Sequence, residues 1–193
     1  MKKYDIIEAA ERQFAREVTL GIIVTRPLTA WHYLIPGFFI IDFLRRGSAI
    51  RRFTKQYMYP RKLAMDSAEV QMRSGNLKII QPELEDNLRH WLESQRFYFP
   101  DLVQAYVVLV DVLKAHYLKL LEAEGDTFYL LIAHAYQHRH NFKDVVEAIS
   151  TAESEVDRLV IKQLGADENL KEKIIAEHQQ IAKRRQKILE EVF

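Results

Sequence analysis

The chain has 193 residues, of which 48% are hydrophobic and 28% are charged, and its formal net charge at pH 7 is +1. These proportions are typical of a folded domain and exclude an intrinsically disordered chain. Because the chain contains no cysteine, disulfides, thiolate metal sites and cysteine nucleophiles are excluded.

The first predicted element is an amphipathic helix that ends or kinks at Arg26-Pro27. Ile7, Phe14 and Val18 belong to an apolar set that recurs every three to four residues, which is the spacing of one helix face. Proline restricts the residue before it to extended conformations, so the helix is not expected to pass this point unchanged.

The next stretch, from Leu28 to Ile41, has no formally charged side chain and contains a break at Pro36-Gly37. A straight membrane-spanning helix needs about 20 apolar residues, so this stretch predicts a proline-broken apolar hairpin that is re-entrant or interfacial. A buried core helix and a surface that docks a protein partner are the alternatives.

A basic block follows, because residues 43–65 contain seven cations and no acid. An apolar segment beside such a block is typical of contact with anionic lipid on the cytoplasmic side, and tryptophan and tyrosine favour the headgroup level. The predicted lipid-binding residues are Trp31, Tyr33, Leu34, Phe38, Phe39, Arg45, Arg46, Arg51, Arg52, Lys55, Arg61 and Lys62. Residues 1–65 are therefore predicted to be a membrane-associating region.

Residues 66–193 are predicted to form a helical bundle with an acidic excess. A charged helix is expected from about Arg61 to Ser74, and later helices are expected to begin near Pro82, Pro100, Thr127 and Asn141 and after Gly165. Since no run of residues alternates as a strand does, the predicted fold is an all-α antiparallel helical bundle.

A histidine cluster gives a second hypothesis for function. His134 and His138 are one helical turn apart, and an antiparallel hairpin at Gly125 would bring His116 level with His134. These three residues are the candidate ligands for zinc or iron, either in a metal-binding protein or in a metal-dependent enzyme. The chain has no Glu-x-x-His pair of the di-iron type. We therefore expect no cofactor, and zinc or iron binding by the three histidines is the alternative.

Catalytic motifs are otherwise absent from the sequence. The glycines are too scattered for a phosphate-binding loop, and no serine lies in a Gly-x-Ser-x-Gly elbow. Glu153, Glu155 and Asp157 are predicted to lie on a solvated helix face, whereas Arg185 falls on the apolar stripe of the last helix, where polar residues often select a partner.

The sequence thus predicts a non-catalytic, peripheral (monotopic) membrane-associated adaptor or accessory subunit on the cytoplasmic face. Its expected partners are anionic lipid and either another protein or a second copy of the chain, in preference to nucleic acid. The alternatives are the metal-binding protein and a wholly soluble, cytoplasmic helical interaction protein in which residues 28–44 are core.

Overall fold

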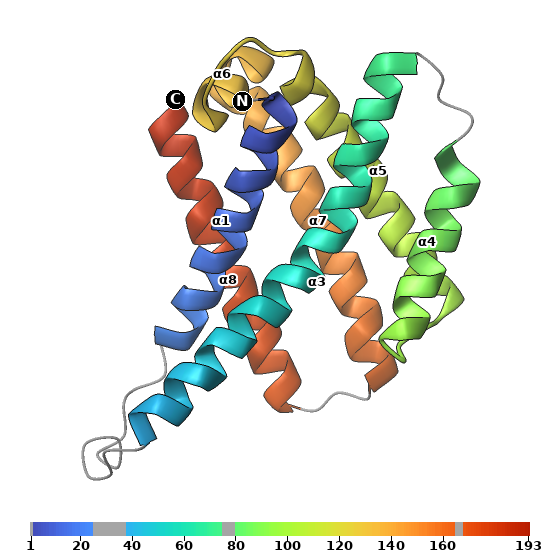
Figure 1. The fold of residues 1–193 in the computed structure, drawn as a ribbon, viewed down its shortest axis with the longest axis vertical. Helices are drawn as coiled ribbons and strands as arrows, with labels where there is room; N and C mark the ends of the chain where they lie inside the picture. The colour runs from blue at the N-terminus through green and yellow to red at the C-terminus, as the bar shows by residue number, and fades with distance from the viewer. Residues whose placement is uncertain (1, 25–37, 75–79, 165–167) are drawn as a thin grey trace.

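A computed structural model describes residues 2–24, 38–74, 80–164 and 168–193. Within these ranges the chain forms seven helices and no strand, which confirms the predicted all-α helical bundle. The helices are α1 (Lys3–Val24), α3 (Phe38–Ser74), α4 (Ile80–Ser94), α5 (Pro100–Glu122), α6 (Phe128–Tyr136), α7 (Arg139–Leu164) and α8 (Glu168–Val192). Both ends of the chain lie near α6 in Figure 1.

Helix α5 is the centre of the bundle and packs against α1, α3, α4, α6 and α7. It begins at Pro100, where a missing backbone N–H costs nothing, and Asp101 lies in its first turn. Its buried residues include Leu102, Leu109, Leu113 and Leu120. The periodic apolar stripe explains why the sequence predicted this helix, and Pro100 explains why its starting point was predicted correctly.

The turn from α5 to α6 depends on two local features. The Thr127 hydroxyl accepts a hydrogen bond from the backbone N–H of Leu130 at 3.3 Å, which confirms the predicted cap. Gly125 has a φ of +148°, and a Cβ atom at this position would lie 3.0 Å from Cβ of Leu130. Glycine is therefore required here by both the backbone conformation and the close approach of α6.

Helix α3 is longer than the sequence predicted, because it begins at Phe38 and continues past Pro60 to Ser74. Proline removes one intrahelical hydrogen bond, and burial of Met58, Ala64 and Met65 around it offsets that loss. The predicted division between residues 65 and 66 lies inside this helix. Ile7 of α1 and core residues on both sides of that division belong to one hydrophobic cluster.

The predicted apolar hairpin lies largely outside the described residues, which resume at Phe38. None of the helices in the described ranges combines the length and the apolar character that a membrane crossing requires.

Candidate functional site

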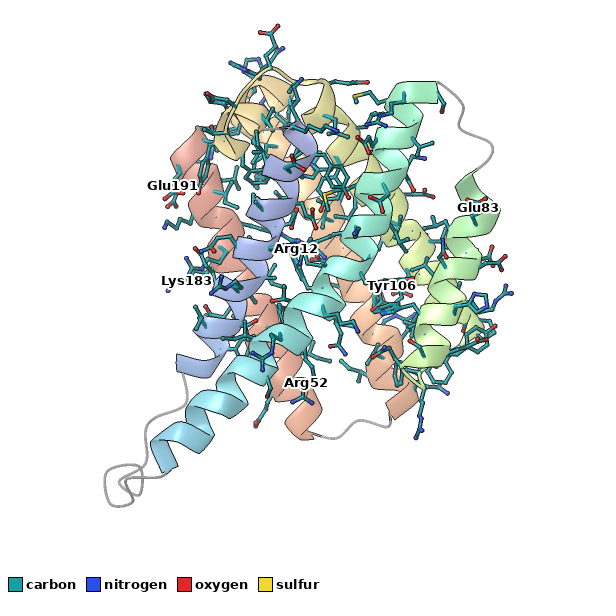
Figure 2. The ribbon with its side chains drawn as sticks, in the orientation of Figure 1. Arg12, Arg52, Glu83, Tyr106, Lys183 and Glu191 are labelled. Carbon is teal, nitrogen blue, oxygen red and sulfur yellow. The ribbon has the colours of Figure 1, made fainter. Side chains whose placement is uncertain are left out.

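A groove of about 680 Å³ lies between α1 and residues 47–62 of α3. Two cations from α1 and three from α3 line it, and no acidic side chain does: Arg12, Arg16, Arg51, Lys55 and Lys62. The remaining lining residues are small, apolar or hydroxyl-bearing. We call this set of residues the cationic groove. Figure 2 shows Arg12 on α1 and Arg52, which neighbours the groove residue Arg51, on α3.

Most charges of the cationic groove are unpaired. Arg12 lies 2.6 Å from Glu8 of its own helix, whereas Arg16 and the three α3 cations form no ion pair within the part of the chain that the structure describes. The Thr54 hydroxyl, on the same stretch of α3, is buried and has no hydrogen-bond partner. The groove therefore combines excess positive charge with an unused hydrogen-bonding group, and both favour an anion.

The predicted lipid-binding residues fall into four groups in the structure. Trp31, Tyr33 and Leu34 lie outside the described residues, and for Phe38, Phe39, Arg45 and Arg46 only the helical backbone is described. Arg51, Arg52, Lys55 and Lys62 are exposed on α3. Arg61 is buried, with 3% of its surface exposed, so this residue points into the protein and not toward a lipid surface. The α1 cations of the groove were not singled out from the sequence.

Arg61 belongs to a buried ionic network that joins α1, α3, α7 and α8. Its guanidinium lies 2.6 Å from Glu153 and 3.2 Å from Glu11, and its Cζ lies 3.4 Å from the centre of the Tyr57 ring. Arg185 makes two further contacts with Glu153, at 2.8 and 2.9 Å. Two cations and two anions therefore balance inside the bundle, and Glu153, which the sequence placed on a solvated face, lies between the two cations.

Neutral side chains make further hydrogen bonds with the charged groups of the network. Tyr117 donates to Glu11 at 2.8 Å, and Arg185 donates to the Ser150 hydroxyl at 2.7 Å. Burial alone raises the pKa of Glu153, but the charges of Arg185 and Arg61 outweigh it and hold the pKa below its ordinary value. The carboxylate is thus ionised at neutral pH, and the network is structural in character.

A partly buried polar group lies where α7 meets α8. His178 Nε2 contacts the Asp157 carboxylate, and Glu177 lines the same pocket. Burial, together with the negative charge of Asp157, raises the pKa of Glu177 to about 7. Burial also raises the pKa of Asp157, although the hydrogen bond from His178 opposes this. One carboxyl group here therefore titrates near neutral pH.

Each of the three candidate metal-binding histidines has a different partner. His116 Nδ1 lies 2.6 Å from the Tyr136 hydroxyl, and His134 Nδ1 lies 2.6 Å from the backbone oxygen of Glu124. The His138 ring stacks on His140. Within the described ranges, no group of three or more histidine, aspartate or glutamate side chains is arranged to hold a metal ion.

The chain matches no known protein-family model, no curated protein and no solved structure. Function must therefore be argued from the sites alone. Of these, the cationic groove has unpaired charge at the surface, whereas the ionic network is internally balanced.

Proposed function

We propose that this protein is a non-catalytic, peripheral membrane-associated helical adaptor or accessory subunit, and that the cationic groove contacts anionic lipid headgroups. The single observation that supports the proposal most directly is that five cations from two helices converge on one groove without an acid. Headgroup phosphates are the matching anions at a membrane surface, and the unpaired cations can approach them without breaking existing ion pairs.

The position of the groove in the chain gives further support. One wall, α1, precedes the stretch from Leu28 to Ile41, which has no formally charged side chain, and the other wall, residues 47–62 of α3, follows it. Insertion of part of that stretch, with α1 and α3 lying along the membrane surface, would bring the groove cations close to the headgroups. The proposed membrane contact therefore has an apolar part and an ionic part.

The expected strength explains why both parts are needed. Each cation near an anionic surface contributes about 1 kcal/mol, so the five groove cations together supply about 5 kcal/mol. This corresponds to binding weaker than about 0.1 mM. Stable attachment generally takes two signals, and the ionic part weakens with salt as the Debye length falls from about 8 Å at 0.15 M to about 3 Å at 1 M.

The test is flotation of the full-length protein with neutral vesicles and with vesicles that contain anionic lipid. The groove variant carries Arg51→Glu, Lys55→Glu and Lys62→Glu. A matched control carries Arg139→Glu, Lys143→Glu and Lys162→Glu, three exposed positions on α7. Both variants undergo the same change in net charge.

We expect the wild type and the α7 variant to float with anionic vesicles and the groove variant to remain behind. If both variants lose binding equally, attachment depends on net charge and the groove is not the contact. If the wild type floats with neither vesicle, the membrane function is wrong and the soluble interaction protein is favoured.

A further inference from the structure

A cavity of about 250 Å³ lies among α1, α3, α5, α6, α7 and α8, away from the cationic groove. Its lining includes exposed residues, among them Gln13 and Lys187, and buried ones, among them His116 and Ile149. The cavity therefore extends from the surface into the core. Most of its lining surface is apolar, with aromatic rings contributed by Phe14 and by residues of α6 and α7.

The charged residues that line this cavity are already balanced. Besides Arg61 and Arg185 of the ionic network, Arg184 lies 2.9 Å from Glu17, and Lys187 lies 3.4 Å from Glu191. The Glu17 pair joins α8 to α1. Tyr129 of α6 donates to Glu191 at 2.8 Å, and Figure 2 shows Glu191 on α8. The cavity thus has no unbalanced charge that would favour a charged ligand.

His116 supplies an unused hydrogen-bond donor at the buried end. Burial raises the pKa of Tyr136 and lowers that of His116 to about 3, so both groups are neutral at pH 7. The phenol is the better donor of the pair and donates to Nδ1, which leaves the ring proton on Nε2. Nε2 has no hydrogen-bond partner in the part of the chain that the structure describes.

Arg184 supplies a second unused donor. Its Nε atom is buried and makes no hydrogen bond, although its guanidinium is paired with Glu17. A buried donor without a partner costs free energy, so an acceptor atom in the cavity would be stabilised. Both features favour the same kind of ligand.

We propose that this cavity binds a small, neutral, mainly apolar molecule that carries a hydrogen-bond acceptor, and that His116 Nε2 donates to that acceptor. An apolar protein cavity of about 150 Å³ holds one benzene molecule. In proportion, the cavity of about 250 Å³ holds about ten non-hydrogen atoms, which is the size of two fused six-membered rings. The site is independent of the membrane function proposed above.

Three bicyclic aromatic probes, of which the two neutral ones are equal in size, test the proposal by NMR titration of the full-length protein at pH 7.5. Quinoline has a ring nitrogen that accepts a hydrogen bond, naphthalene has no such acceptor, and 2-naphthoate is charged. We expect saturable binding of one quinoline per chain, about fivefold tighter than naphthalene because of one hydrogen bond, and no saturable binding of 2-naphthoate. Equal affinities for quinoline and naphthalene would refute the role of His116.

Two alanines on α1 supply a matched pair of variants. Ala10 lines the cavity, whereas its neighbour Ala9 is exposed and does not. Ala10→Leu is expected to fill part of the cavity and to weaken quinoline binding at least tenfold, and Ala9→Leu is expected to leave it unchanged. Unaltered binding by the Ala10 variant, or no binding of quinoline by the wild type, would overturn the proposal.

The His116→Phe variant tests the donor directly while keeping an aromatic ring. It is expected to bind naphthalene at least as tightly as quinoline, because the quinoline nitrogen gives up its hydrogen bond to water and no longer meets the His116 donor. A retained preference for quinoline would show that another group recognises the acceptor and would contradict the assignment.

Discussion

Glu153 is the residue whose replacement most directly tests the buried ionic network. It accepts hydrogen bonds from Arg61 at 2.6 Å and from Arg185 at 2.8 and 2.9 Å. With Glu11 as the remaining anion, the Glu153→Gln variant has two buried cations and one anion. Breaking a buried ion pair by removing one partner costs about 3–5 kcal/mol, and we expect the free energy of unfolding to fall by this amount.

Urea denaturation followed by circular dichroism measures this loss, provided that the slope with denaturant is unchanged. Glu155→Gln is the matched control, since Glu155 is an exposed residue of α7 that pairs with Arg158; surface pairs of this kind contribute little. If Glu153→Gln costs no more than Glu155→Gln, the described network does not hold the helices together.

A double variant separates charge balance from packing. Glu153→Gln combined with Arg185→Met leaves Arg61 and Glu11, which lie 3.2 Å apart, as a balanced pair. Because an uncompensated buried charge is more costly than an apolar replacement, the double variant is expected to be more stable than Glu153→Gln alone. If Glu153→Gln alone is the more stable variant, the stability comes from the individual hydrogen bonds of Arg185 and not from charge balance.

Three further predictions concern stability. The pKa of Glu177 is raised to about 7 from 4.5, so the folded state loses stability as pH rises through this interval. Between pH 4 and pH 8 the Glu177→Gln variant is therefore expected to gain about 2–3 kcal/mol of unfolding free energy relative to the wild type. Urea denaturation at several pH values measures this gain, and a difference that does not change with pH would contradict the raised pKa. Thr127→Ala removes the cap of α6 and should cost about 1 kcal/mol, whereas Thr151→Ala, at an exposed position within α7, should cost less. Gly125→Ala should lower the melting temperature, because φ is +148° and alanine is strained there; an unchanged melting temperature would contradict this conformation.

The sequence predicted those helices whose limits depend on local signals. Pro100 begins α5 and Thr127 caps α6, and each acts through residues within one turn of the chain. The extent of α3 could not be predicted in this way. Its passage through Pro60 depends on packing against α5 and α1, which residues distant in the sequence provide.

The burial of Arg61 could not be predicted from the sequence because it, too, depends on residues distant in the chain. From the sequence it is one cation in a run of seven, and nothing local separates it from Lys62, which is exposed. Its partners Glu11 and Glu153 lie 50 and 92 residues away, so its burial follows from the tertiary fold. Arg185 gave a clearer signal, because a charged residue on an otherwise apolar helix stripe needs a buried partner.

Helix α3 contributes to both proposed sites, so it could couple them. At 100° per residue, Arg51, Lys55 and Lys62 share one face of the helix, whereas Tyr57 and Arg61, which line the cavity, lie about 120° around it. Because Arg61 is held by Glu11 and Glu153, exchange of surface charges on the first face should not move it. The groove variant with Arg51→Glu, Lys55→Glu and Lys62→Glu is therefore expected to bind quinoline as the wild type does. A tenfold change in quinoline affinity would mean instead that the sites are linked through α3, and vesicles that bind the groove would then have to change quinoline affinity reciprocally.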